Sequence, residues 1–304
     1  MMEAVVVGVG SIGSRHITNL KKLGVESIYL YDPVKGVGTK DWWKQVAGRI
    51  VVIASPTKYH AEQVQLALKH GATGVYVEKP AACSGAELAA TVLEGGAVKV
   101  ATGYNWRFSP LAEELRGLQK THGPFQRLAY IGSNDVTNWR GYGPEYYAID
   151  SVGGGALLTS LSHTVDLVLH IMGPSRFVTA ACGHDAAFSG VDTSWMIELM
   201  HQDARTSTLS FMWTDRQPMV NKWFGVLENG RMMATTGDPR YWPEGTDMHL
   251  ECMRAFVSWV DGGEPGNLCT LQQSFETMHA LDLIREVATG VLTEEQLRTL
   301  RGID

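Results

Sequence analysis

The sequence predicts an α/β protein with a doubly wound parallel sheet, followed by a second α/β domain with an open, mostly antiparallel sheet. In the first hundred residues, short β-branched apolar runs alternate with helical patterns, which is typical of parallel strands joined by helices. From about residue 109, the apolar runs are separated by short polar turns instead. The 304 residues suffice for about two domains. We place the boundary after residue 104, giving domains of 1–104 and 105–304.

Composition excludes several classes of protein. Apolar residues make up 44% of the chain and charged residues 19%, so it has enough apolar material for a sizeable core. The net charge is −6 and there is no basic run, which argues against a nucleic-acid partner. The longest apolar runs are only as long as a strand, so no membrane span is expected. Four cysteines without a CxxC pair indicate reduced thiols, and the N-terminus lacks signal-peptide features, so we expect a cytoplasmic protein.

A glycine-rich turn follows the first predicted strand, Ala4–Val7. It reads Gly8-Val9-Gly10-Ser11-Ile12-Gly13 and opens a helical pattern that ends near Gly24. In such a turn the first glycine permits the tight bend, the second lets the backbone approach a pyrophosphate, and the third lets the helix pack on the strand. The helix N-terminus then offers free N–H groups to phosphates. The context predicts a dinucleotide site.

An acidic residue ends the second predicted strand, Ser27–Tyr31. Asp32 lies 19 residues after Gly13, where a carboxylate accepts hydrogen bonds from the adenosine ribose. This carboxylate favours NAD(H), because it repels the extra phosphate of NADP(H). Lys35 lies close enough to weaken that preference, so NADP(H) stays possible.

The other predicted strands of this domain also end in polar or turn residues. Ile50–Ala54 leads to Ser55-Pro56-Thr57, where Thr57 caps a helix over 58–70. The strand Gly74–Val77 leads to Glu78-Lys79-Pro80, and Val98–Thr102 leads to Gly103-Tyr104-Asn105-Trp106-Arg107-Phe108. In doubly wound sheets ligands bind at the carboxyl ends of the strands, so these segments are candidates for one site.

In the second half, alternating patterns predict strands without a parallel crossover. The expected strands are 125–134, 176–182, 194–201, 206–213, 222–227 and 231–235, and the expected helices are 110–120, 156–172, 247–260 and 271–288. The helix over 156–172 has an apolar face and, opposite it, a stripe of Thr159, His163, Asp166 and His170. This stripe is either a solvated face or the lining of a cleft. Its spacing also permits a metal site, but we expect none, because the proposed chemistry needs no metal.

Taken together, these motifs resemble the Gfo/Idh/MocA oxidoreductase family. The resemblance rests on the glycine turn with Ser14-Arg15-His16, on Ser55-Pro56-Thr57, on Glu78-Lys79-Pro80, and on the segment Gly103–Phe108. In the second half, Gly153-Gly154-Gly155-Ala156-Leu157-Leu158 leading to His163 resembles a second family signature. The match runs over most of the chain, and the Glu-Lys-Pro tripeptide is its most specific element.

The resemblance implies a Rossmann domain and hydride transfer between a nicotinamide cofactor and a hydroxyl or keto carbon of a sugar, sugar nucleotide or cyclitol. It implies that Lys79 and His163 handle the proton, with Thr159 beside them. It also implies a homodimer or homotetramer formed through the second sheet. The expected cofactor site comprises Gly8, Gly10, Ser11, Ile12, Gly13, Asp32, Ser55, Pro56, Thr57, His60, Glu78, Lys79 and Asn105. The expected substrate site comprises Tyr104, Arg107, Trp139, Arg140, Tyr147, Thr159 and His163.

Each candidate also has a structural interpretation. Lys79 is then a surface lysine after a strand, Glu78 a carboxylate near a helix start, and Arg107 part of a structural ion pair. The aromatic residues, which include Tyr104 and Trp139, then belong to a core or an oligomer contact.

The sequence departs from the family pattern at two places. The segment between Asp32 and Ile50 is short and rich in glycine and lysine, so we expect a reduced or missing strand there. Thr159 stands where many members have an aspartate four residues before the histidine, which puts the usual proton relay in doubt. Two other functions therefore stay open: a non-catalytic nicotinamide-binding regulator, and an imine or cyclic-ketone reductase.

Overall fold

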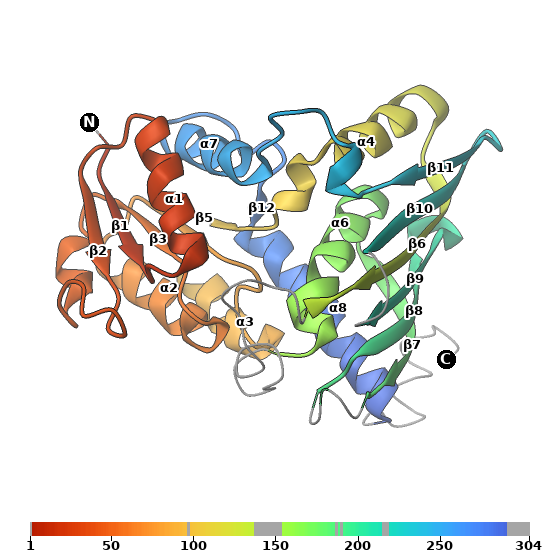
Figure 1. Cartoon of the computed structure of the whole chain (residues 1–304), viewed down its shortest axis with the longest axis horizontal. Coiled ribbons are helices and arrows are strands. Elements are labelled where there is room, and N and C mark those ends of the chain that lie inside the picture. Colours follow the sequence, from red (N-terminus) through yellow and green to blue (C-terminus); the bar gives the residue numbers. More distant parts are fainter. Residues whose placement is uncertain are drawn as a thin grey trace. The chain divides into compact units, whose positions relative to one another are not determined.

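The computed structural model describes residues 2–95, 98–136, 154–185, 188, 191–214 and 219–290. The chain forms two compact units (Figure 1). Unit 1 comprises Met1–Phe108 and Asp247–Met278, and unit 2 comprises Ser109–Thr246 and His279–Asp304. The expected domains divide the chain once, at residue 104, whereas these units divide it at 108, 246 and 278.

Unit 1 contains a six-stranded sheet of the expected doubly wound type. Its strand order is β12-β5-β4-β3-β1-β2, in which β1 to β5 are parallel and β12 is antiparallel to β5. The strands are β1 (Ala4–Val7), β2 (Ile28–Tyr31), β3 (Ile50–Ile53), β4 (Gly74–Val77), β5 (Lys99–Thr102) and β12 (Cys269–Thr270). The helices are α1 (Ser11–Lys22), α2 (His60–Lys69), α3 (Gly85–Gly95) and α7 (Met248–Val260). Strands β1, β3 and β4 are buried along their whole length, as expected for parallel strands covered on both faces.

The segment between β2 and β3 contains no sheet strand, as the sequence indicates. Strand β2 is the edge of the sheet, and residues 33–49 form turns and a 3-10 helix, Trp42–Gln45. Trp42 is buried and stacks on Tyr31 with ring centroids 6.5 Å apart. A short aromatic segment therefore packs beside β2, where the expected strand is missing.

Helix α7 packs in the core of unit 1, although it lies far along the chain. Phe256 makes an edge-to-face contact with Tyr76 of β4 at 5.5 Å. Gly74 leaves the space for this contact, because an added Cβ would lie 2.5 Å from Val260 Cγ2 and 3.3 Å from Phe256 Cζ. The apolar pattern of 247–260 predicts a helix with a buried face but does not reveal which sheet that face covers.

Unit 2 contains a six-stranded, mostly antiparallel sheet, as expected. Its order is β11-β10-β6-β9-β8-β7. The strands are β6 (Phe125–Asn134), β7 (Ser175–Gly183), β8 (Ser194–His201), β9 (Thr206–Trp213), β10 (Val220–Leu227) and β11 (Met232–Thr236). Strands β6 and β9 are parallel neighbours, so the expectation that this half has no parallel crossover is wrong, whereas the expected mostly antiparallel sheet is confirmed. Short turns in the sequence predict antiparallel pairing only between strands that follow one another in the chain. They give no information on β6 and β9, which are separated by β7 and β8.

Unit 2 contains the helices α4 (Pro110–His122) and α6 (Ser162–Met172), and the residues of α8 (Leu271–Thr289) are divided between the two units after Met278. The two faces of the unit 2 sheet differ in exposure. In β8 the residues alternate between buried and exposed, as in a strand that packs on one face only. The buried face packs on the helical segment 157–172, since Trp213 Nε1 donates to Ser160 Oγ at 3.0 Å. None of the helices within the described residues is long and apolar enough to cross a membrane.

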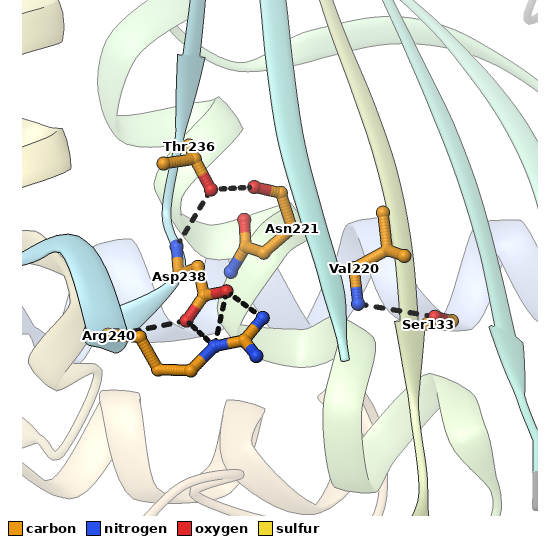
Figure 2. Close-up of polar contacts among 6 residues, drawn as sticks. All are labelled: Ser133, Val220, Asn221, Thr236, Asp238 and Arg240. Carbon is orange, nitrogen blue, oxygen red and sulfur yellow. Dashed lines mark hydrogen bonds and ion pairs between the residues drawn. The ribbon is translucent and has the colours of Figure 1, made fainter. Parts of the chain in front are cut away.

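A compact polar turn follows β11 (Figure 2). Thr236 Oγ1 donates to the carbonyl of Asn221 at 2.7 Å and accepts from the Asp238 N–H at 3.2 Å. The buried Asp238 carboxylate accepts the backbone N–H and the guanidinium of Arg240, which lowers the pKa of this carboxyl. These bonds satisfy the backbone where the chain leaves the sheet.

Removing the Phe256 side chain tests the assignment of α7 to the core of unit 1. We expect Phe256→Ala to lower the free energy of unfolding by about 3–5 kcal/mol, because it leaves a cavity against Tyr76. Arg254→Ala on the same helix is the matched control, because its side chain is 54% exposed. Urea denaturation followed by circular dichroism measures both. Equal midpoints for the two variants would contradict the assignment.

Candidate active site

The glycine turn between β1 and α1 is held by backbone contacts that exclude side chains. Gly8 has φ +90, and a Cβ there would lie 2.6 Å from the carbonyl carbon and oxygen of Ala54. A Cβ on Gly13 would lie 2.0 Å from the Gly8 oxygen. These two glycines therefore let the turn pack against the end of β3 and let α1 pack against the turn.

Gly10 differs from its two neighbours, because nothing lies within 4 Å of an added Cβ. It is the N-cap residue of α1, offers no side-chain cap, and is followed by no acidic residue in the first turn. Ser11 and Ile12 form the start of the helix. The open space at Gly10 and the uncapped helix N-terminus fit a dinucleotide pyrophosphate, which would use both.

Asp32 is buried at the end of β2 and faces the glycine turn. Its Oδ2 accepts the Val9 N–H at 2.8 Å, and its Oδ1 accepts the N–H groups of Val34 and Lys35 at 3.0 Å. Burial raises the pKa of this carboxyl, but the backbone donors outweigh it and hold the pKa below the ordinary value. Lys35 Nζ donates to the Val9 carbonyl at 2.5 Å. The site therefore has a fixed negative charge with a lysine close to it.

At the end of β3 the predicted residues contact protein groups. Ser55 Oγ donates to Gln63 Oε1 at 2.6 Å, and Pro56 precedes a 3-10 turn in which Thr57 is buried. His60 is fully buried, with Nδ1 2.8 Å from the Pro80 carbonyl and Nε2 2.7 Å from the Ser55 carbonyl. Burial lowers the pKa of His60. These contacts favour a structural role for His60, which joins the loops after β3 and β4.

Glu78 and Lys79 follow β4. Glu78 Oε1 lies 2.6 Å from Nε2 of His16, a buried residue of α1, and the Glu78 side chain is only 13% exposed. Burial raises the pKa of the Glu78 carboxyl, but His16 outweighs it and the net shift is downward. For Lys79, burial lowers the pKa to about 8, although the charge of Glu78 opposes this. The pKa of Lys79 is therefore closer to neutral pH than that of an exposed lysine.

The residues after β5 divide into two groups. Asn105 is buried, and its Oδ1 has no hydrogen-bond partner within the part of the chain that the structure describes. A carboxamide or hydroxyl donor of a ligand would satisfy this oxygen. Arg107 is also buried, and its Nη1 donates to the Leu268 carbonyl at 3.2 Å and to Gln273 Oε1 at 2.8 Å. These bonds favour the structural interpretation for Arg107. The burial of Tyr104 favours the structural interpretation for Tyr104 as well.

The carboxyl ends of the five parallel strands bring the unit 1 candidates to one edge of the sheet. The glycine turn, Asp32, Ser55, Glu78-Lys79 and Asn105 each follow one of these strands directly. The strand pairing places the end of β1 between the ends of β2 and β3, and β4 and β5 follow. This edge is where doubly wound folds bind their ligands.

In unit 2 the chain is helical over 156–172, as predicted. Thr159 lies in the first part of this segment, a π-helical turn, Leu157–Leu161, that precedes α6. The first N–H group of this turn is bound by the carboxylate of Asp192, which the sequence analysis did not indicate. Asp192 Oδ2 accepts the Leu157 N–H at 2.8 Å, and Gly155, with φ +88, has no room for a Cβ beside Asp192 Oδ1. The glycine signature before the helix therefore accommodates Asp192.

The predicted polar stripe on α6 is only partly solvent-exposed. Asp166 is fully buried and Thr159 is 8% exposed, whereas His163 is partly exposed. His170 Nε2 lies 3.4 Å from Arg116 Nη1. Within the described ranges, no group of three or more histidine, cysteine, aspartate or glutamate residues is arranged to hold a metal ion. The burial of Asp166 rules out a uniformly solvated face.

The predicted substrate residues Trp139, Arg140 and Tyr147 lie outside the described residues. Two residues that the sequence analysis did not assign to the site are His16 and His249. His16 follows Gly13 by three residues, and this short distance from the glycine turn could have indicated that it lies near the site. His249 gave no signal, because only the tertiary packing brings α7 to α1, where Arg15 Nη1 donates to His249 Nδ1 at 3.0 Å.

Comparisons with known proteins support the fold. No family model matches the chain, and no curated protein matches its sequence. A myo-inositol dehydrogenase from Corynebacterium glutamicum has a TM-score of 0.74 and 16% identity, over 96% of this chain and 97% of that one. The WlbA dehydrogenase from Bordetella pertussis, in complex with NADH and UDP-GlcNAcA, has a TM-score of 0.77 and 17% identity, over 96% and 97%. An oxidoreductase from Agrobacterium radiobacter, in complex with NAD+, L-tartaric acid and magnesium, has a TM-score of 0.75 and 16% identity, over 96% and 97%. The chain has the two-part α/β fold of these proteins.

Adding a methyl group at Gly10 tests whether its open space holds a pyrophosphate. We expect Gly10→Ala to fold with an unchanged melting temperature, because no protein atom lies within 4 Å of the added Cβ. NAD binding should weaken by about 10-fold or more, equivalent to roughly 1.4 kcal/mol. Calorimetric titration with NAD measures this. The control is Gly117→Ala, whose Cβ also meets nothing within 4 Å but lies on α4. Unchanged NAD binding in Gly10→Ala would contradict the assignment.

Proposed function

We propose that this protein is an NAD(P)-dependent dehydrogenase or reductase that acts on a hydroxyl or keto carbon of a sugar, sugar nucleotide or cyclitol. One observation carries the proposal. At one edge of a doubly wound sheet, a glycine turn with an open position lies with a fixed carboxylate, Asp32, and a lysine whose pKa is lowered to about 8, Lys79. Cofactor binding alone does not require that lysine, whereas proton transfer does.

Several residues of unit 1 would hold the cofactor. The N–H groups at the start of α1 would bind the pyrophosphate, and Asp32 would accept a ribose hydroxyl. The carboxylate favours NAD(H), because a ribose phosphate would meet its negative charge. Asn105 offers its unpartnered Oδ1 to the cofactor's nicotinamide end or to the substrate. When bound, the nicotinamide would supply or accept the hydride.

The substrate class rests on the resemblance of the motifs and on the fold neighbours. One neighbour is named for myo-inositol and another is bound to a sugar nucleotide, and both have the same two-part fold. Polyhydroxylated rings of this kind present a secondary alcohol that a hydride-transfer enzyme oxidises. We also place the protein in the cytoplasm, where its four cysteines, none of which forms a disulfide, stay reduced.

Lys79 and His163 handle the proton in this proposal. In oxidation, the neutral Lys79 amine accepts the hydroxyl proton as the hydride leaves, and in reduction the ammonium form returns it. His163 anchors the hydroxyl or passes the proton on. Thr159 orients the substrate through its hydroxyl, which neither loses nor gains a proton at neutral pH. The position that many family members fill with aspartate therefore contributes a hydrogen bond and no charge.

The pH dependence of turnover tests the role of Lys79. We expect the oxidation rate to rise with pH through about 8, because the base form of Lys79 predominates above its pKa. The reverse reduction should fall over the same range. Lys79→Ala should lower turnover by about 10²–10⁴-fold and leave NAD binding intact. The measurement is nicotinamide absorbance with NAD and a panel of sugar nucleotides, sugars and cyclitols.

The control for this assay is Lys58→Ala, which removes a lysine whose amine lies over the ring of the exposed Tyr59. It should keep the activity and the pH profile of the unaltered chain. Full activity in Lys79→Ala would remove Lys79 from the mechanism. NAD binding without turnover on the whole panel, in both directions, would favour the regulator instead.

The exposed face of the unit 2 sheet supports a homo-oligomer. Met232 is 78% exposed, Met196 67%, Met212 53% and Ile131 50%, and Phe224 also faces solvent. These residues lie on β11, β8, β9, β6 and β10, and those on β6, β8, β9 and β10 alternate with buried positions. An apolar face of this extent on a sheet is typical of a protein–protein interface. We propose that two copies of the chain pair through it.

A charge on this face tests the pairing. We expect Phe224→Asp to convert the oligomer to monomers, because burying an unpaired carboxylate in an apolar interface costs several kcal/mol. Sedimentation equilibrium measures the mass. Val34→Asp is the control, since Val34 is 95% exposed and belongs to unit 1. A monomeric unaltered chain, or an unchanged mass of Phe224→Asp, would refute the proposal.

A further inference from the structure

The starting observation is a buried hydrogen bond between His16 and Glu78, beside the proposed catalytic lysine. The His16 side chain has no exposed surface, and its Nε2 lies 2.6 Å from Glu78 Oε1. An ionised carboxylate only accepts hydrogen bonds, so Nε2 carries the hydrogen in this contact. The ring also meets Tyr76 edge to face at 5.2 Å. Gly103 leaves room for the carboxylate, because a Cβ there would lie 3.0 Å from Glu78 Oε1.

A hydrogen bond of this kind contributes little net stability, because both groups are hydrogen-bonded to water in the unfolded chain. Its location points to another role. His16 lies on α1, three residues after Gly13, whereas Glu78 directly precedes Lys79 at the end of β4. The pair therefore connects the helix that begins at the glycine turn with the strand end that presents the lysine.

Two neighbouring side chains could bind the Glu78 carboxylate, His16 on α1 and Lys79, the next residue in the chain. In the structure its Oε1 is directed to His16, and its Oε2 accepts the Lys79 backbone N–H at 3.3 Å. A direct ion pair with the Lys79 ammonium would favour the charged lysine and remove the base. Because the Glu78 carboxylate contacts His16, it affects Lys79 only through its negative charge, which raises the pKa of the lysine.

We propose that His16 is a positioning residue for Lys79, because it holds the Glu78 carboxylate toward α1 and so prevents a direct ion pair with the lysine. The proposal rests on the proposed role of Lys79 in proton transfer. In this proposal α1 contributes to the site in two ways: its N-terminus binds the cofactor, and its His16 holds the Glu78 carboxylate away from the Lys79 amine.

The other titratable groups around Glu78 do not replace His16. Burial lowers the pKa of His249 in α7 to about 4, although the charge of Glu78 opposes this shift. His249 is therefore neutral near neutral pH. His60 of α2 is engaged by two backbone carbonyls. Tyr76 of β4 donates to Cys252 Sγ at 3.5 Å, and burial raises its pKa well above the ordinary value.

The test measures the pKa of Lys79 directly. The amine of the full-length protein is acetylated competitively across a range of pH, and the Lys79 peptide is quantified by mass spectrometry. We expect Glu78→Gln to lower the pKa of Lys79 by about one pH unit, because it removes the neighbouring negative charge. His16→Leu should raise it by a similar amount, because the freed carboxylate pairs with the ammonium. His16→Gln, which keeps an N–H donor, should stay close to the unaltered protein.

The double variant His16→Leu with Glu78→Gln distinguishes this role from a structural one. His16 acts through Glu78 in the proposal, so the double variant should match Glu78→Gln alone. The control is His201→Leu, which removes another buried, hydrogen-bonded histidine, in unit 2, and should leave the pKa of Lys79 unchanged. If His16→Leu does not fold, an unchanged Lys79 pKa in Glu78→Gln still overturns the proposal.

An unchanged or lowered pKa of Lys79 in His16→Leu overturns the proposal, as does an additive effect in the double variant. The measurement needs no substrate, so it is independent of the proposed reaction. Full turnover in Lys79→Ala would refute the proposed reaction and leave the measured linkage between His16 and Lys79 intact.

Discussion

The close approach of the β1–α1 turn to the end of β3 is the constraint on which the candidate site depends. Gly8 touches the backbone of Ala54, and Gly13 touches the oxygen of Gly8, with no room for a Cβ at either. This packing places the N-terminus of α1 at the carboxyl edge of the sheet and leaves Gly10 facing open space. It also brings His16, three residues after Gly13 on the same helix, into contact with Glu78.

Charge is distributed unevenly around this edge. Asp32 is held by three backbone donors, so its negative charge is fixed before any ligand binds. The Glu78 carboxylate is instead held by a side-chain hydrogen bond to His16. Lys79 lies next to Glu78 with its pKa lowered by burial. One carboxylate thus suits binding of a neutral ribose, and the other suits control of a proton.

Unit 2 contributes through different means. The N-terminal end of its helical segment contacts Asp192, whose carboxylate accepts a hydrogen bond from the Leu157 N–H and one from the indole N–H of Trp195 at 2.5 Å. The π-helical turn that follows contains Thr159, and such turns are frequent at functional sites. The opposite face of the same sheet exposes a row of methionines and Phe224. One sheet therefore supports a candidate substrate helix on one face and a candidate subunit contact on the other.

Local pattern in the sequence was sufficient for the five parallel strands of unit 1 and for the residues that end them, but not for β12 at the edge of the same sheet. The glycine turn, Asp32, Glu78 and Lys79 could be found because each directly follows a short apolar strand, and parallel strands place such residues at one edge. The return of α7 to unit 1, the parallel pairing of β6 with β9, the structural bonds of Arg107 and the contact of His16 with Glu78 were decided by the tertiary structure. Each joins segments far apart in the chain, and hydrophobic periodicity shows which face of an element is buried but not what it is buried against.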